Sequence, residues 1–233
     1  MTRGAGQGFT LVEVAIVLVL IGLLLGGILK GHELLANARV HRLIAQQEGI
    51  KVAFYGFQER FRAAPGDYAL ALTTISGVTQ NGNGNGRVET TTVPNEAVLA
   101  WEHLSRAGFL TRTYTYGGTE SVATSPVNPY GVYLQFVFDG IYGPGTTAAP
   151  SQLRHNLKTG SQIPVGIVAE MDRKVDDGAP NTGAFQFSRY QGNAPTAPAD
   201  DSPLQPSCTS AATPTGIWNA ANEASNCGGA SLL

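Results

Sequence analysis

Glu13 has the most informative surroundings of any ionisable residue in this chain. It is the only ionisable side chain in the apolar run from Phe9 to Leu29. An acidic side chain near the middle of a membrane costs about 2.5 to 3.5 kcal/mol on insertion scales, and the cost falls toward the ends of the span. A carboxylate in this position therefore indicates a specific partner. The simpler alternative is a charge that reaches the membrane interface.

A glycine-rich loop has the spacing of a calcium site. Residues 81–86 read NGNGNG, so oxygen-bearing side chains stand at Asn81, Asn83 and Asn85. A hard cation prefers carboxylates, however, and Thr92 stands where a calcium loop of this type ends with a glutamate. The loop is therefore a calcium candidate, and an ordinary surface turn is the alternative.

Asp172, Asp176 and Asp177 form a second candidate cluster of oxygen ligands. Solvated acids at an edge turn are a simpler explanation of the same three residues. We expect no cofactor in this protein, and calcium is the one ion that these two clusters would suit.

The sequence lacks the motifs that identify common enzyme sites. It contains no G-x-S-x-G, no H-E-x-x-H and no P-loop pattern. Its histidines are scattered, and none forms a pattern with a nucleophile and an orienting acid: His32, His41, His103 and His155. We therefore expect no catalytic residues and a protein that is not an enzyme.

The composition indicates a loop-rich exported domain. Charged residues make up 14% of the chain, compared with roughly 25% in typical soluble domains. The formal net charge is −2, so the sequence predicts no basic surface for DNA or RNA. Glycine and proline are plentiful, at 29 and 13 residues, and favour loops and turns.

The two cysteines, Cys208 and Cys227, lie 19 positions apart near the C-terminus. Small and polar residues separate them, which suits a disulfide-closed loop in an oxidising compartment. Two unrelated reduced thiols are the alternative. The apolar N-terminal run indicates export, and export favours the disulfide.

The apolar run is long enough to cross a membrane. About 20 helical residues at roughly 1.5 Å each span the ~30 Å hydrocarbon core of a bilayer. The run is longer than the apolar region of a secretory signal peptide, and no small-residue cleavage site follows it. A short polar leader, residues 1–8, precedes it instead.

The junction between leader and apolar run carries a specific motif. Residues 8–13 read GFTLVE, and a full-length apolar stretch follows. This segment resembles the prepilin signature of type IV pilins and type II secretion pseudopilins. The resemblance implies that a membrane peptidase cuts after Gly8, that the new terminal residue Phe9 is N-methylated, and that Glu13 becomes the fifth residue of the mature chain. Gln7 departs from the pattern, because a basic residue is more usual there.

The same resemblance gives Glu13 a partner. Cleavage would create an ammonium group at Phe9, which the carboxylate of a neighbouring subunit could bind in a filament. Both charges would then be neutralised in a low-dielectric environment, where either one alone would be very costly. Such a pair favours one axial register between subunits.

The sequence predicts an α+β protein with a pilin-like layout, in which a long N-terminal helix packs on a small antiparallel sheet. The first half of that helix is the transmembrane half. The expected segments are a leader, a transmembrane or filament-core helix, its amphipathic continuation, a globular head, and an irregular C-terminal region with the disulfide loop: residues 1–8, 9–30, 31–62, 63–190 and 191–233.

Within the head, one short helix and three strands are expected. Asn95 is a suitable N-cap for a helix over residues 96–107, and Gly108 suits the position after its end. Strands are predicted at residues 132–138, 163–171 and 184–190. Several head motifs look like a group of bacterial pilin-like proteins known mainly by their N-terminal segment: APGD at 64–67, the Asn/Gly loop, WEHL at 101–104 and DRKVDDGAP at 172–180.

The resemblance implies a structural subunit, either a pilin or a minor pilin, of a type IV pilus-like filament. Two alternatives stay open: a pseudopilin of a type II secretion system, and a tip or minor subunit whose head binds a surface or ligand. The implied partners are the prepilin peptidase and N-methyltransferase, other pilin subunits and the inner-membrane assembly machinery, and no nucleic acid. The chain would cross the inner membrane once with its head in the periplasm, and later join a periplasmic or cell-surface filament.

Overall fold

The computed structural model divides the chain into two units, Met1–Arg39 and Val40–Leu233. The predicted leader and the predicted cleavage residues, Gly8 and Phe9, lie outside the residues that the structure describes. The described residues are 10–143, 152–200, 207–210, 216–222 and 224–233.

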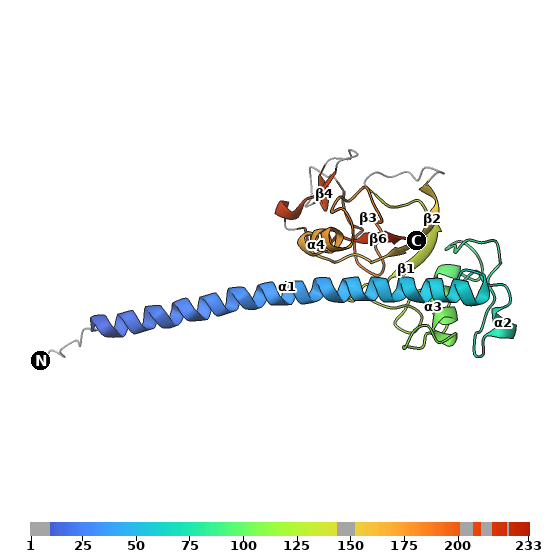
Figure 1. Cartoon of the computed structure of the whole chain (residues 1–233), viewed down its shortest axis with the longest axis horizontal. Coiled ribbons are helices and arrows are strands. Elements are labelled where there is room, and N and C mark those ends of the chain that lie inside the picture. The colour runs from blue at the N-terminus through green and yellow to red at the C-terminus, as the bar shows by residue number, and fades with distance from the viewer. Residues whose placement is uncertain (1–9, 144–151, 201–206, 211–215, 223) are drawn as a thin grey trace, which may run out of the picture. The chain divides into compact units, whose positions relative to one another are not determined.

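Helix α1 (Leu11–Phe61) is a single helix of 51 residues and forms one continuous ribbon in Figure 1. It confirms the prediction of one helix from about residue 10 to about residue 62. No proline occurs before Pro65, and Arg62 adopts a left-handed φ of 55° directly after the helix. The chain therefore leaves the helical path just before the APGD motif at residues 64–67.

In the second unit, α1 buries one face of the amphipathic continuation that the sequence predicts at residues 31–62. Gln47 is the one polar residue in it, and the structure gives the reason for its presence. Its side-chain oxygen accepts a hydrogen bond of 3.0 Å from the hydroxyl of Ser231, inside the core. This bond ties the helix to the last strand of the sheet. The buried residues of α1 are Val40, Leu43, Gln47, Ile50, Ala53, Phe54 and Phe57.

The head contains a four-stranded antiparallel sheet in the order β1–β2–β6–β3. With α1, it confirms the predicted α+β class. The strand predicted at residues 184–190 contains β3, and the one predicted at 132–138 overlaps β1. The bounds are Gln135–Asp139 for β1, Arg154–Lys158 for β2, Phe185–Phe187 for β3 and Gly229–Leu232 for β6.

Strand β2 is missing from the sequence prediction because it reads RHNLK, which lacks apolar alternation. Its polar residues are stabilised inside the fold. The Lys158 ammonium lies 2.5 Å from the Asp139 carboxylate on β1, and the Lys158 side chain is almost fully buried. Burial lowers the pKa of Lys158, and the adjacent charge of Asp139 opposes that shift.

The strand predicted at residues 163–171 is wrong, because this segment belongs to helix α4 (Val165–Val175). Pro164 is the N-cap residue of α4, and with φ −58° and ψ 137° its backbone is still extended where the helix begins. The buried residues recur with the three- and four-residue spacing of one helix face, which the sequence analysis mistook for a short buried strand. They are Val165, Val168, Ala169, Met171 and Asp172.

The C-terminal region is not irregular, which corrects the prediction for residues 191–233. Strand β6 lies between β2 and β3 in the sheet, and Figure 1 draws it in red beside the C-terminus. A second pair joins β4 (Thr209–Ser210) to β5 (Ile217–Trp218). The sequence GASL has weak strand propensity, but small residues are needed here. A Cβ at Gly229 would lie 2.1 Å from the Phe185 ring, so only glycine lets the two strands approach.

Helix α3 (Glu96–Arg106) confirms the predicted head helix, and Gly108 follows it with φ 85°, as expected for a residue after a helix end. The prediction that Asn95 caps this helix through its side chain is wrong. The Asn95 side chain makes no capping bond. The backbone N–H groups of Glu96 and Ala97 instead donate to the carbonyl of Glu89, at 3.0 and 3.3 Å.

Candidate assembly site

Thr10 and Glu13 form a reciprocal cap at the start of α1. The Glu13 carboxylate accepts hydrogen bonds from the Thr10 backbone N–H and from the Thr10 hydroxyl, both at 2.8 Å. In return, the Glu13 N–H donates to the Thr10 hydroxyl at 3.3 Å. This is a capping box, in which two backbone donors at a helix start are satisfied together. The carboxylate is therefore held at the N-terminal end of the helix, beside the backbone of residue 10.

The prediction from the sequence includes Glu13 but not Thr10. The signal was present, because a threonine followed three residues later by a glutamate, just before an apolar run, is the sequence signature of a capping box. The acidic group also lies where the positive end of the helix dipole favours it.

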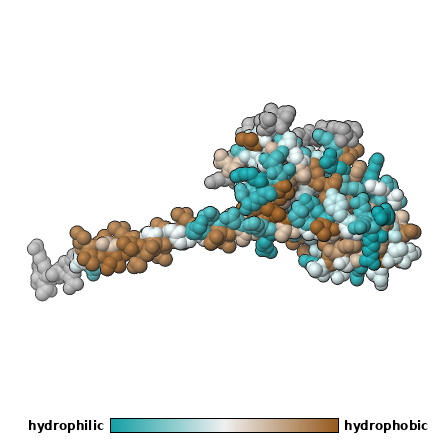
Figure 2. Space-filling model, viewed as in Figure 1, coloured by the Kyte–Doolittle hydropathy of each residue, from teal (hydrophilic) through white to brown (hydrophobic). Residues whose placement is uncertain are grey.

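Beyond the cap, α1 presents a continuous apolar surface in the first unit. Figure 2 shows it as brown side chains along the helix. The most apolar 18-residue window of α1 is 0% buried, and α1 is long and apolar enough to cross a membrane. At the far end of this stretch, Lys30 pairs with Glu33 at 2.6 Å, where the polar residues begin. An exposed apolar surface of this size requires lipid or other protein around it.

The exposed fractions along this surface are large on every side of the helix. Leu11 is 86% exposed, Leu23 is 70% and Leu29 is 72%. A helix that is apolar all round and uncovered by its own chain is typical of a membrane span or of a subunit contact. Glu13 is the only ionisable residue between Leu11 and Leu29.

Residues 5–29 match the family model of the prokaryotic N-terminal methylation motif. These residues are a prepilin-type methylation segment. The match supports a type IV pilin-like or pseudopilin chain that prepilin peptidase processes and pilin-type machinery assembles. It marks a structural class that is usually not enzymatic, and the apolar helix that follows fits membrane anchoring. Neither the curated proteins nor the solved structures gave a match to this chain.

The Asn/Gly loop, the first calcium candidate, is held by hydrogen bonds within the head. Each asparagine oxygen accepts a backbone N–H: Asn81 from Leu72, Asn83 from Asn85, and Asn85 from Arg87, all at 2.8 to 2.9 Å. The oxygens of Asn83 and Asn85 accept from residues two positions further along the chain, as in local turns, whereas that of Asn81 holds the segment at Leu72.

Two buried carboxylates that the sequence analysis did not single out clamp the same loop. Asp67 accepts the N–H groups of Asn85 and Gly86, both at 2.9 Å. Glu96 accepts those of Asn83 at 2.9 Å and Glu89 at 3.1 Å. Burial raises the pKa of Asp67 and of Glu96, while these backbone donors oppose the shift. The loop is therefore a structured turn, fixed by acids from outside it.

The second calcium candidate brings its three residues together. One carboxylate oxygen each from Asp172, Asp176 and Asp177 lies within 4.8 Å of the others. Asp172 is fully buried and accepts a hydrogen bond of 2.6 Å from the indole of Trp218. Burial, followed by the charges of Asp177 and Asp176, raises the pKa of Asp172 to about 7, although the bond from Trp218 opposes the shift.

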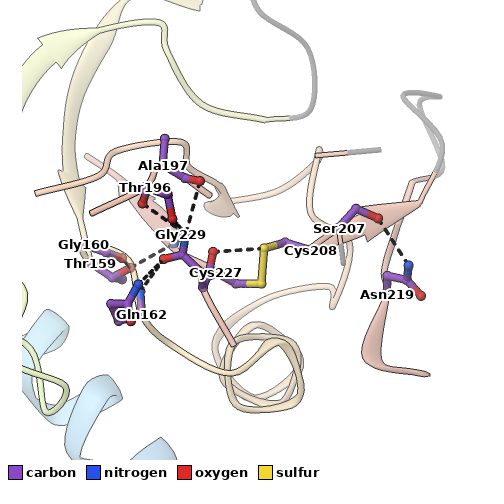
Figure 3. Close-up of a disulfide and its surroundings, with 11 residues drawn as sticks. Thr159, Gly160, Gln162, Thr196, Ala197, Ser207, Cys208, Asn219, Cys227 and Gly229 are labelled. Carbon is purple, nitrogen blue, oxygen red and sulfur yellow. Dashed lines mark hydrogen bonds between the residues drawn. A yellow bond between two sulfur atoms is a disulfide. The ribbon is translucent and has the colours of Figure 1, made fainter. Parts of the chain in front are cut away.

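The structure contains the predicted Cys208–Cys227 disulfide (Figure 3). Both cysteines are buried, at 1% and 0% exposed. Cys227 exchanges backbone hydrogen bonds of 2.8 and 3.1 Å with Ile163, just before α4. The amide of Asn226 accepts from the side chain of Gln162 at 2.7 Å and donates to the carbonyl of Thr196 at 3.1 Å. The disulfide therefore connects Cys208, next to β4, with Cys227, which lies in the hydrogen-bonded segment just before β6.

His103 has a structural environment. Its Nδ1 accepts the Gly66 N–H at 3.0 Å, so the proton resides on Nε2, which donates to the Gln80 carbonyl at 3.1 Å. Burial lowers the pKa of His103 and keeps the ring neutral. The neighbouring Glu102 accepts the N–H groups of Thr79 at 2.9 Å and Tyr116 at 3.1 Å. This pair fastens the loops around α3.

His155 is half-buried and packs against aromatic residues of the core. Its ring stacks on Phe136 with centroids 5.6 Å apart and planes at 6°. Burial lowers the pKa of His155 to about 4, so the ring is neutral at physiological pH. Among the described residues, neither His103 nor His155 makes a hydrogen bond or ion pair with a candidate nucleophile.

Proposed function

We propose that this chain is a structural subunit, a pilin or minor pilin, of a type IV pilus-like filament. Prepilin peptidase cuts it between Gly8 and Phe9 and methylates the new amine. The observation that carries the proposal is the methylation segment at residues 5–29, followed by an apolar helix that its own chain leaves uncovered. Such a helix is stable in the membrane before assembly and among neighbouring helices afterwards.

The capping box supports a specific assembly role for Glu13. The carboxylate is held beside residue 10, within one residue of the position where the ammonium of Phe9 arises. An incoming subunit then meets a carboxylate that is already oriented. In our proposal the two charges pair between subunits, and the pairing selects one axial register among helices that are otherwise apolar.

A pseudopilin of a type II secretion system is the second candidate, because pseudopilins carry the same kind of methylation segment. Shearing cells and probing the released material with an antibody to the head separates the two. Surface filaments that contain this chain support the pilus proposal. Its confinement to the cell envelope, together with loss of protein secretion in a deletion strain, supports the pseudopilin.

A tip subunit, whose head binds a surface or ligand, is a further proposal. It is tested by measuring whether the same deletion strain loses adhesion to surfaces.

Processing at Gly8 is the most direct prediction. Mass spectrometry of membrane fractions should find a mature chain that begins at a methylated Phe9. Gly8→Ala should still be cut because the side chain stays small, whereas Gly8→Glu should accumulate as the full-length precursor. A chain that retains Met1 in cells with an active prepilin peptidase would refute the assignment of the cleavage site.

A further inference from the structure

We propose that Asn85 is a deamidation site and that the buried carboxylate of Asp67 keeps this site slow to react. Asn85 is followed by Gly86 in the Asn/Gly loop, and both residues are exposed to water. Deamidation is sterically easiest where glycine follows asparagine, because glycine has no Cβ to shield the backbone nitrogen that attacks. The same pair of residues occurs twice more in the loop, which reads NGNGNG over residues 81–86. This inference is independent of the proposed filament function.

Deamidation at Asn85 would proceed through a cyclic succinimide. The Gly86 nitrogen loses its proton to a base in the solvent and attacks Cγ of Asn85, which forms a new C–N bond. The Cγ–Nδ2 bond then breaks, and Nδ2 takes up a proton and leaves as ammonia. Water opens the ring at either of its carbonyl groups and leaves aspartate or isoaspartate. The net reaction consumes one water molecule and releases one ammonia.

The nitrogen that must attack is bound to Asp67. The Gly86 N–H donates to one carboxylate oxygen of Asp67 at 2.9 Å, and the Asn85 N–H donates to the other at 2.9 Å. Asp67 is 2% exposed, so water screens its charge poorly. Removal of the Gly86 proton would place a nitrogen anion beside this carboxylate, and a nearby like charge disfavours ionisation. The carboxylate therefore raises the barrier for the attack on Asn85.

The side chain of Asn85 is held by two further hydrogen bonds. Its Oδ1 accepts the Arg87 N–H at 2.8 Å, and its Nδ2 donates to the carboxylate of Glu89 at 2.8 Å. The bond to Glu89 is lost when Nδ2 departs as ammonia. An aspartate in this position would instead place a second carboxylate against Glu89. The folded loop therefore opposes the reaction, and the product would destabilise the loop.

The other two glycine nitrogens of the loop are held by backbone carbonyl groups. Gly82 donates to the carbonyl of Tyr68 at 3.1 Å. Gly84 donates to the carbonyl of Asp67 at 2.9 Å. Neither bond depends on a side chain, so both should survive replacement of the Asp67 carboxylate. The three asparagines of one chain can therefore be compared, and only Asn85 precedes a nitrogen that the carboxylate binds.

The test is mass spectrometry of the full-length chain, folded in detergent micelles and incubated in a mildly alkaline buffer. Peptides that cover residues 81–86 report aspartate and isoaspartate at each asparagine. In a parallel sample that is reduced and unfolded in urea, all three asparagines should convert. In the folded wild type, Asn85 should convert at least about tenfold more slowly than in urea, a factor that corresponds to about 1.4 kcal/mol.

Asp67→Ala should accelerate the conversion of Asn85 about tenfold over the folded wild type and leave the other two asparagines nearly unchanged. Glu96→Ala is the matched control. Glu96 is also buried and also accepts two backbone N–H groups of this segment, from Asn83 and Glu89, but neither N–H belongs to a glycine. The control should convert at Asn85 at the rate of the wild type.

If Asp67→Ala unfolds the head, all three asparagines will convert as fast as in urea. The isosteric Asp67→Asn then takes its place, because it loses only the charge and one acceptor oxygen. The proposal is overturned if folded wild type converts at Asn85 as fast as the urea sample, or if neither Asp67 variant converts faster there than Glu96→Ala. Slower conversion in the Asp67 variants would also contradict it, since the carboxylate would then act as a base that promotes the reaction.

Discussion

Replacement of Glu13 by valine should leave processing and membrane insertion intact and abolish filament assembly. Insertion becomes easier without the charge, since a carboxylate opposes burial in the membrane. Assembly fails because the ammonium of a neighbouring Phe9 would be buried without a partner. Loss of one member of a buried pair costs about 3 to 5 kcal/mol, which is a factor of roughly 10² to 4 × 10³ in each subunit addition. Sheared filaments should fall below detection, while mass spectrometry still finds the mature N-terminus.

Glu13→Gln separates the two roles of this side chain. Glutamine can still accept hydrogen bonds from Thr10 and complete the capping box, but it carries no charge. We expect it to fail in assembly as valine does. Leu11→Val, at an exposed apolar neighbour, is the control and should assemble normally. If processed Glu13→Gln subunits form filaments as well as the wild type, the carboxylate acts as a helix cap and the charge-pairing mechanism is wrong.

Removal of the disulfide should have the largest effect on the stability of the head. The bridge closes a segment whose ends are 19 positions apart, and the chain-entropy relation assigns about 3 kcal/mol to a loop of this length. The double variant Cys208→Ala, Cys227→Ala should therefore lower the melting temperature by roughly 6 to 12 °C for a domain of this size. Because Cys227 leads directly into β6, proteolysis should cut first near the C-terminus.

Alkylation of the exported wild type tests the redox state from which this prediction starts. Without reduction, neither Cys208 nor Cys227 should react, and after unfolding and reduction both should. The reduced wild type should then melt near the temperature of the double variant. Labelling of both cysteines in unreduced protein would show that the loop is open, and an unchanged melting temperature in the double variant would show that the bridge is not a stabilising element.

Local patterns account for what the sequence predicted correctly. The length of α1 follows from the absence of proline before Pro65, and its buried face follows from apolar residues at helical spacing. The motif at residues 8–13 indicated the methylation segment, because the motif is defined by residues that follow one another directly in the chain. The cysteine pair was predictable for the same reason, once the apolar run indicated export.

Long-range packing accounts for what the sequence did not predict. Strands β2 and β6 consist mainly of polar or small residues, so their sequences do not indicate strands. In the fold, Lys158 of β2 pairs with Asp139 of β1, and Gly229 of β6 leaves room for the Phe185 ring of β3. The roles of Asp67 and Glu96 as clamps on the Asn/Gly loop depend on residues far away in the chain. Such partners leave no periodic signal in the sequence.

The sequence by itself determined the class of this protein. It contains a methylation segment, an apolar run with Glu13 as its one carboxylate, and a head with a disulfide-forming cysteine pair. Only the tertiary structure decided that residues 165–175 form a helix rather than a strand, that the last residues form a central strand, and that the three aspartates near α4 converge. The physical reason is that membrane insertion and helix periodicity act on neighbouring residues, whereas sheet order and buried carboxylates depend on contacts between residues far apart in the chain.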